Sequence, residues 1–271
     1  MQITANIYVE TGYRGTNVGY ITTERGVVMI DSPWRPTDAV TWRRQIEEKG
    51  HISYLINTHS HHDHVFGNFF FTAPIIAHQK AREAILVADK NELLARLAEI
   101  DPEGLPMVSE YHINAPSITF SEHLTMYLGG PTIQLIHLPG HTPGEIGIVV
   151  PEERVVFVGD NIFCRLQAFL HESDPFTWLQ SLKRIGELEV DHIVPGHGEV
   201  CDKSYLAEQS GFIQEWVDIV KRAIDQGRTK EEALSEISLL DRYPMAPGNE
   251  KMGPELQRMN ISRLYDVLTQ K

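Results

Sequence analysis

The sequence predicts an α/β protein, in which strands and helices alternate along most of the chain. Three observations favour this class. Short runs rich in β-branched and aromatic residues, such as residues 26–30 and 155–158, are typical of strands. Longer stretches with helical spacing of apolar residues, such as 79–100, lie between them. Histidines and aspartates follow directly after apolar runs, where loops place functional side chains.

Length and composition fit one large domain, or one domain with an appendage. The chain has 271 residues, of which 42% are hydrophobic and 23% are charged, and a chain of this length can bury a substantial core. Its longest apolar stretches, such as residues 146–150, are far shorter than the roughly 20 residues that a membrane span needs. The first residues have no basic start and no long apolar run, so we expect no secretory leader and a cytoplasmic protein.

The charge balance argues against a nucleic-acid partner. The formal net charge is −13, and the sequence shows no basic run, whereas contact with phosphates needs lysines and arginines on one face. We therefore expect a small-molecule substrate, no nucleic acid and no membrane, and we leave a homodimer open. The informative excess is the 13 histidines, several of which lie in tight clusters.

The first part of the chain is predicted to form strands around one helix. The predicted strands are residues 3–9, 15–23, 26–30 and 52–57. Thr-Glu-Arg-Gly at 23–26 is typical of a hairpin turn. Residues 36–49 are predicted to be helical and to end at Gly50. The last strand leads directly into Thr-His-Ser-His-His-Asp-His at 58–64.

The middle of the chain continues this alternation. Residues 79–100 predict one helix, which Asp101-Pro102 ends, and a loop follows to about residue 115. Strands are then predicted at 117–120, 123–128, 132–137, 145–150, 155–158 and 192–194. Asp174-Pro175 predicts the start of a helix that runs to about residue 188, because aspartate is a good cap and proline suits the first turn.

From residue 204 onward the pattern is helical. Residues 229–232 form a predicted capping box, and residues 254–268 predict a last amphipathic helix. No flexible linker precedes this tail, so we expect it to pack on the same domain. The predicted division is therefore a catalytic domain at 1–202 and a helical C-terminal extension at 203–271.

The segment from His59 to His64, His-Ser-His-His-Asp-His, carries the strongest chemical signal. Imidazole and carboxylate are suitable donors for zinc and similar divalent ions. His59 and His61 are two residues apart, so an extended loop can present both to one metal. Asp63 and His64 can face a second metal nearby. We expect the side chain of His62 to point away from its neighbours.

Three further donors follow apolar strands, and each lies beside a glycine. They are His141 in Leu-Pro-Gly-His-Thr-Pro-Gly, Asp160 after Val-Val-Phe-Val-Gly, and His197 in Pro-Gly-His-Gly. Glycine permits tight turns and a close approach of the backbone to a ligand. Together with the segment at 59–64, these donors predict a metal site built from loops that are far apart in the sequence.

This pattern resembles the His-x-His-x-Asp-His signature of the metallo-β-lactamase superfamily. The later His141, Asp160 and His197 match the remaining metal motifs of that superfamily in order, and Asp31 matches the aspartate that ends its first hairpin. The resemblance covers roughly residues 3–200. It implies a four-layer αβ/βα sandwich, with the site at one edge between two sheets.

The resemblance also implies how the donors divide between two divalent metal ions. The first metal would be bound by His59, His61 and His141. The second would be bound by Asp63, His64 and His197, with Asp160 as the bridge. Zinc is the expected metal, with iron and manganese as alternatives. With an aspartate at position 160, the chain is similar to the glyoxalase II and lactonase branches of the superfamily. It differs there from the β-lactamases that have a cysteine at this position. Asp31 would hold the loop that carries the site.

The function that the resemblance implies is hydrolysis by a metal-activated water. Two metals about 3.5–4 Å apart would share one water and lower its pKa toward about 7. The bridging hydroxide would cleave an ester, thioester, lactone or amide-like bond of a small acyl substrate. Asp63 is the candidate catalytic proton acceptor. No Gly-x-Ser-x-Gly elbow that would indicate a serine nucleophile is present.

Two other functions on the same fold stay open. Iron in place of zinc would give a redox enzyme similar to persulfide dioxygenases, and metal content would separate the two. A phosphodiesterase or nuclease would use the same kind of centre, although the acidic charge balance counts against it.

Substrate contacts are predicted less directly than metal ligands. Tyr13, which lies at a predicted hairpin tip beside two glycines, and Asn161 are the candidate substrate-binding residues. Phe163 occupies the position where the lactonase branch has tyrosine, which weakens a lactonase assignment. Residues 245–254, rich in Pro, Gly and Met, are a candidate cover for a neighbouring pocket.

Overall fold

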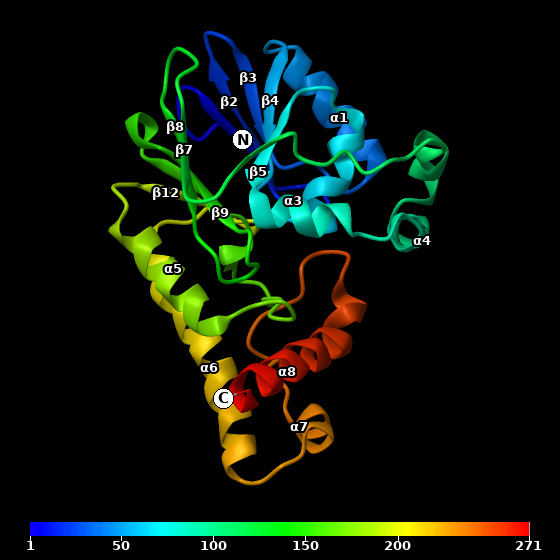
Figure 1. Cartoon of the computed structure of the whole chain (residues 1–271), viewed down its shortest axis with the longest axis vertical. Coiled ribbons are helices and arrows are strands. Elements are labelled where there is room, and N and C mark those ends of the chain that lie inside the picture. Colours follow the sequence, from blue (N-terminus) through cyan, green and yellow to red (C-terminus); the bar gives the residue numbers. More distant parts are fainter. Residues whose placement is uncertain (271) are drawn as a thin grey trace.

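The first half of the chain forms a six-stranded sheet in the computed structural model, which describes residues 1–270 (Figure 1). The strands lie in chain order: β1 (Ile7–Glu10), β2 (Val18–Thr23), β3 (Gly26–Ile30), β4 (Ile52–Ile56), β5 (Ile75–His78) and β6 (Ile118–Phe120). The pairing is antiparallel from β1 to β3 and parallel from β3 to β6. Thr23 pairs with Gly26, so the predicted hairpin turn between β2 and β3 is confirmed.

The second half forms a five-stranded sheet. Its strands, in spatial order, are β12 (His192–Val194), β10 (Val155–Phe157), β9 (Ile146–Val150), β8 (Ile133–His137) and β7 (His123–Met126). Since β9 is antiparallel to both β8 and β10, and β10 is parallel to β12, the strands β8, β10 and β12 all run in one direction. Their carboxyl ends therefore lie at the same edge of the sheet. A short pair, β11 (Phe163–Cys164) and β13 (His197–Gly198), lies beyond that edge.

Buried apolar clusters show that the two sheets and their helices form four layers. One cluster fills the space between the sheets, with Ile30 from one and Ile148 from the other. Helix α1 (Pro36–Glu47) covers the first sheet through Trp42 and Ile46. Helix α5 (Pro175–Glu187) covers the second, helix α6 (Leu206–Asp225) packs against α5, and side chains of both share a cluster with Val149 and Val156 of that sheet. The predicted four-layer α/β sandwich is confirmed.

The predicted single helix at 79–100 is wrong, because the structure has two helices there. They are α3 (Gln79–Leu86) and α4 (Lys90–Ile100). The side chain of Asp89 accepts a hydrogen bond from the backbone N–H of Asn91 at 2.8 Å and so caps a new helix. Val87, in the break, is 83% exposed, so no packing holds this segment in a helical conformation.

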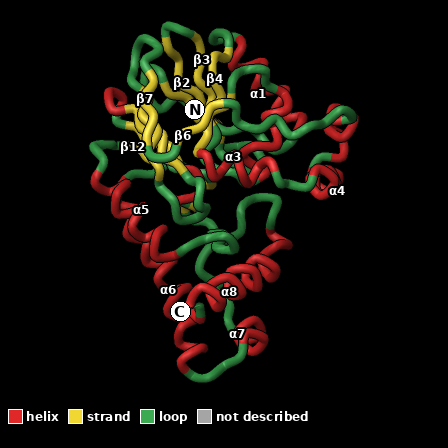
Figure 2. Tube along the Cα trace, viewed as in Figure 1, coloured by secondary structure: helices red, strands yellow, loops and turns green. Residues whose placement is uncertain are grey.

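The C-terminal region adds α7 (Lys230–Glu236) and α8 (Gly253–Thr269) to α6. The predicted capping box at Thr229 and Glu232 is present. These helices lie at one end of the molecule, away from most of the sheet strands (Figure 2). Ile213, Ile261 and Leu264 nevertheless share one buried cluster with Trp178 of α5, so α6 and α8 pack on the second sheet's helical layer. Within residues 1–270, no helix is both long and apolar enough to cross a bilayer.

Candidate metal centre

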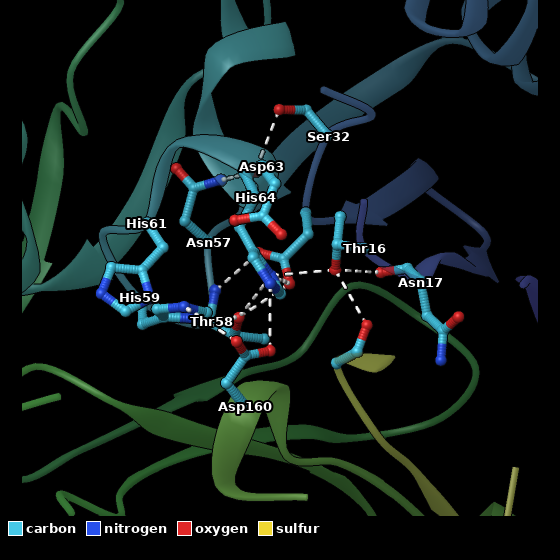
Figure 3. Close-up of polar contacts among 12 residues, drawn as sticks. Thr16, Asn17, Ser32, Asn57, Thr58, His59, His61, Asp63, His64 and Asp160 are labelled. Atoms are coloured by element: carbon cyan, nitrogen blue, oxygen red, sulfur yellow. Dashed lines mark hydrogen bonds and ion pairs between the residues drawn. The ribbon is translucent and has the colours of Figure 1, made fainter. Parts of the chain in front are cut away.

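The loops that follow β4, β8, β10 and β12 meet at the edge where the two sheets come closest to the C-terminal helices. The segment at 59–64 follows β4 and includes the short helix α2 (His62–Val65). His141 follows β8, Asp160 follows β10, and His197 follows β12. Figure 3 shows the side chains of this edge directed toward one another, with Asp160 facing the segment after β4.

One group of converging donors consists of His59, His61, His141 and Asp160. Their nearest ligand atoms all lie within 4.8 Å of one another. Nδ1 of His61 is 3.1 Å from Nε2 of His141. Two imidazoles on one tetrahedral zinc, each with a bond of about 2.0–2.1 Å, have their nitrogens about this far apart.

A second group, Asp63, His64 and His197, lies on the other side of Asp160 and also fits within 4.8 Å. Asp160 touches both groups. Its Oδ1 is 3.1 Å from Nε2 of His64, and its Oδ2 is 3.2 Å from Nε2 of His197 and 3.5 Å from Nε2 of His141. The seven predicted ligands are thus brought together, with one carboxylate between two sets of three.

Close backbone approach at Gly196 makes this arrangement possible. A Cβ atom there would lie 1.9 Å from Oδ1 of Asp160 and 2.8 Å from the backbone of Gly159. No side chain larger than hydrogen fits, so the Pro-Gly-His-Gly turn has a physical reason in this structure.

Other protein groups hold the donor imidazoles from behind. Nδ1 of His64 is 2.8 Å from Oδ2 of Asp31, whose carboxylate also accepts hydrogen bonds from the backbone N–H and the hydroxyl of Thr58. Nδ1 of His141 donates to the carbonyl oxygen of Phe169 at 2.9 Å. Such contacts fix the orientation of each ring. The structure therefore places Asp31 where the sequence suggested, behind the site.

Sequence reasoning missed two glutamates of this kind. Glu145 is fully buried, and its Oε1 lies 3.4 Å from Nδ1 of His59 and accepts the backbone N–H of Asp160 at 2.8 Å. Glu172 has Oε2 3.4 Å from Nε2 of His61, and the ring of His171 stacks on that of His61 with ring centres 5.1 Å apart. A carboxylate at the start of an apolar strand was the only signal for Glu145, and Glu172 had none.

Burial and charge set the protonation of the donors. Burial holds the pKa of His59 and of His141 well below the usual value, which favours neutral imidazoles. Burial also opposes the charged form of His64, but the nearby carboxylates of Asp160 and Asp31 raise its pKa well above the usual value. For Asp160, burial would raise the pKa, but the surrounding His197, His64 and His59 hold it well below its usual range.

The residues present fit a pair of divalent cations. Nε2 of His59 is buried and has no hydrogen-bond partner among residues 1–270. A buried polar atom without a partner costs about 1–3 kcal/mol, which a bound cation would offset. Neutral imidazoles and ionised carboxylates are the forms that bind zinc, iron and manganese.

Two cavities flank the centre and meet at His197. The smaller one, about 100 Å³, is lined by Asp63 and Asp160 and by the apolar side chains of Trp34, Phe163 and Phe169. The larger one, about 750 Å³, is lined by Tyr13 and opens beside His197. His62 lines the smaller cavity but belongs to neither group of converging donors.

The two candidate substrate contacts have different positions. Tyr13 lies on the wall of the larger cavity. Asn161 is fully buried and donates its side-chain N–H to the carbonyl oxygen of Leu138 at 2.8 Å, so the structure does not bring it to either cavity. The segment before α8 does reach the site, because Ala246 lines both cavities and Met252 lines the smaller one.

Comparisons with known proteins are consistent with this geometry. A sequence model described as the metallo-beta-lactamase superfamily matches residues 11–197. The beta-lactamase-like protein 2 homolog of Caenorhabditis elegans is 28% identical over 193 residues, which are 70% of this chain and 58% of that protein. A hydroxyacylglutathione hydrolase of Mesorhizobium japonicum is 24% identical over 217 residues, covering 80% of this chain and 71% of that protein.

One solved structure matches nearly the whole chain. It is the sec-alkylsulfatase Pisa1 from Pseudomonas sp., with a TM-score of 0.68 and 17% identity over 98% of this chain and 49% of that one. At this identity the likeness shows the fold alone. The chain thus spans a little over half the length of the first of these relatives and about half of the matched structure.

Proposed function

The chain belongs to the metallo-beta-lactamase superfamily, and on that premise we propose that it is a metal-dependent hydrolase of small acyl substrates. The observation that carries the proposal is the position of Asp160, whose Oδ2 lies 3.5 Å from Nε2 of His141 in one triad and 3.2 Å from Nε2 of His197 in the other. A single carboxylate between two sets of three donors is an arrangement that would suit a pair of neighbouring divalent cations.

In this proposal each triad binds one divalent cation. His59, His61 and His141 bind the first, and Asp63, His64 and His197 bind the second. Asp160 contributes to both. Bound there, the cations supply Lewis-acid polarisation of the scissile group and lower the pKa of water. Zinc is the metal we propose, since three-histidine and histidine–carboxylate sets suit it.

Asp63 is the proposed proton acceptor. Both carboxylates line the smaller cavity, but the side chain of Asp63 is 24% accessible to solvent and that of Asp160 only 4%. Oδ2 of Asp63 is 3.4 Å from Nε2 of His197. A carboxylate so placed can take a proton from the attacking water and pass it to the leaving group.

The cavity favours an acyl substrate over a nucleic acid. Trp34, Phe163 and Phe169 supply apolar walls beside the donors, and the net charge of −13 opposes a polyphosphate chain. Esters and thioesters are the proposed substrates, since hydroxyacylglutathione hydrolases are among the chain's relatives. Lactones and amide-like bonds are the next to test.

Metal analysis combined with a substrate panel tests this function. The purified chain is assayed for zinc, iron and manganese and is then offered esters, thioesters, lactones, lactams, phosphodiesters and a persulfide with dioxygen. We expect close to two metal ions per chain and turnover of an ester or thioester that a chelator abolishes. Full activity in metal-stripped protein would refute the proposal, and iron with dioxygen uptake would replace it with the redox alternative.

His61→Ala and His62→Ala form a matched pair for the site itself. These neighbours differ in that His61 belongs to a converging group and His62 does not. We expect His61→Ala to lose bound metal and activity, and His62→Ala to keep the metal content of the unaltered chain. Equal metal content in the two variants would contradict the ligand assignment.

A further inference from the structure

The side chains that line the larger cavity carry a net positive charge, although the chain as a whole is acidic. It is lined by two arginines, Arg14 and Arg165, and by one carboxylate side chain, that of Glu199. The chain as a whole carries a net charge of −13, so a cavity lined with a net positive charge stands apart from the rest of the protein. It adjoins the candidate metal centre at His197, which lines both cavities.

The backbone of Arg165 has an unusual conformation that hydrogen bonds fix. Its φ is 57°, in the left-handed region that non-glycine residues rarely adopt. Its backbone N–H donates to the hydroxyl oxygen of Tyr205 at 2.7 Å, and that hydroxyl donates to the carbonyl of Phe163 at 3.0 Å. Strained backbone of this kind persists where the surroundings enforce it, and such residues cluster at functional sites.

The guanidinium of Arg165 is free to bind a ligand. It forms no ion pair and no side-chain hydrogen bond with any residue in the described range 1–270, although five other arginines of the chain pair with carboxylates. Its side chain is exposed on the wall of the cavity. An arginine without a carboxylate partner in an acidic protein is available for an anion from outside.

Arg14 approaches the same cavity from the loop after β1. Its Nη2 donates to the carbonyl oxygen of Gly248 at 2.5 Å, and no carboxylate within residues 1–270 pairs with it. Gly248 has a φ of 83°, and a Cβ there would lie 2.8 Å from Nε of Arg14. The absence of a side chain at Gly248 thus lets the loop before α8 lie against the guanidinium and fix its position.

We propose that Arg14 and Arg165 bind an anionic group at the far end of the substrate, while the scissile acyl group lies at the donors beyond His197. This assignment rests on the proposed hydrolase function. Guanidinium groups bind carboxylates through paired, charge-assisted hydrogen bonds. The volume of about 750 Å³ and the side chains of Tyr13 and Leu166 leave room for a carbon chain between the two ends. The substrate class is therefore an ester or thioester that carries a remote carboxylate.

Two matched substrates test the charge preference. We would compare p-nitrophenyl hydrogen glutarate, which has a free carboxylate, with its neutral methyl ester, using the metal-loaded full chain. A charge-assisted pair is worth about 1.5–3 kcal/mol, so we expect kcat/KM to favour the anionic substrate about 10- to 100-fold. The preference should reside mainly in KM and should shrink at high salt.

The variants remove each arginine with little change of backbone. Arg165→Gly tolerates the positive φ, and Arg14→Gln keeps a donor for the Gly248 carbonyl. Both should lose most of the preference for the anion, measured as the ratio of kcat/KM for the two esters. Arg25→Gln, at the exposed hairpin turn between β2 and β3, is the matched control and should keep the preference. Equal kcat/KM for the two esters in the unaltered chain would overturn the proposal.

A binding measurement separates this proposal from the hydrolase function. Glutarate should raise the melting temperature of the chain more than uncharged glutaramide does, and Arg165→Gly should remove that difference. If His61→Ala shows the same difference in melting temperature between glutarate and glutaramide, the anion binds at the arginines and not at the metal. If no ester is hydrolysed but glutarate binds in this way, the hydrolase proposal fails and the anion site stands. If esters are hydrolysed and glutarate shows no arginine-dependent binding, the anion site fails alone.

Discussion

Single residues behind the proposed metal ligands fix how those side chains are oriented. Asp31, Glu145 and Glu172 each place a carboxylate near the ring nitrogen of a donor histidine. Of the three, Glu172 is the most exposed, with half of its side chain accessible to solvent. It can therefore be changed without opening the core, which makes it the best residue for testing this role.

Glu172→Ala should weaken metal binding without unfolding the protein. Loss of a carboxylate behind a ligating histidine typically costs about 10- to 100-fold in metal affinity. Because this one is half exposed, we expect about tenfold, measured by competition with a chelator, with partial recovery in Glu172→Gln. Glu99→Ala, on the exposed surface of α4, is the control. Unchanged metal affinity in Glu172→Ala would show that Glu172 does not help to orient His61.

Metal binding should release protons near neutral pH. Burial opposes the charged form of His64, but Asp160 and Asp31 raise its pKa well above the usual value, so we expect this imidazole to carry a proton in the metal-free protein. It must lose that proton to bind a cation. Affinity should thus fall as the pH is lowered. Calorimetric titration of the metal in two buffers with different ionisation enthalpies measures the release, and an identical heat in both would contradict the prediction.

Among the elements, helix α8 stabilises the site from a distance. The side chain of Asn260, fully buried in α8, accepts the backbone N–H of Leu170 at 2.7 Å and donates to the carbonyl of Ala168 at 2.8 Å. Between these two residues lies Phe169, whose carbonyl oxygen accepts the hydrogen bond from His141. A residue of the C-terminal region therefore positions the backbone that orients a predicted ligand.

Asn260→Ala should lower the free energy of unfolding by about 2–6 kcal/mol, because two buried backbone groups lose their partners at about 1–3 kcal/mol each. Denaturant titration of the metal-free chain measures the loss. Asn91→Ala on exposed α4 is the control and should change stability by less than about 0.5 kcal/mol. An equally small change in the free energy of unfolding for Asn260→Ala would contradict the prediction and would indicate that water replaces the hydrogen bonds of the side chain.

Sequence reasoning predicted elements well where the signal is local. The cap at Asp174, the capping box at Thr229 and the donor cluster at 59–64 each lie within a few residues, and the structure contains them. The strand β5, only four residues long, was missed, and the helix break before Asp89 was overlooked. Glu145 and Asn260 could not be predicted because their partners are brought near only by the tertiary fold.

At the scale of the whole molecule, the C-terminal helices are part of the main core. Trp216 of α6 and Leu264 of α8 are buried in the same cluster as Trp178 of α5 and Val156 of the second sheet. The predicted boundary at residue 202 marks where the candidate metal ligands end in the sequence. It does not divide the core, because the apolar packing continues across it. The family match ends near the same point, at residue 197.

A chain shortened to residues 1–202 should fail to form a stable fold. Removal of α6 to α8 would expose the large apolar side chains of α5, and exposed patches of this kind lead to aggregation. We expect the shortened chain to be insoluble, or to bind a hydrophobic dye without a cooperative unfolding transition. Cooperative unfolding together with full metal content would show that residues 203–271 are a separate addition.

The convergence of the two triads on Asp160 has a consequence for the stability of the folded chain and for its degradation. Each triad combines two residues from the segment 59–64 with one histidine from the second half of the chain, so a cation bound there would cross-link the two halves. Because the donors converge only in the folded chain, a cation that binds them would raise the free energy of unfolding. We therefore expect the metal-free form of the chain to unfold more often than the metal-bound form and to be degraded first by proteases.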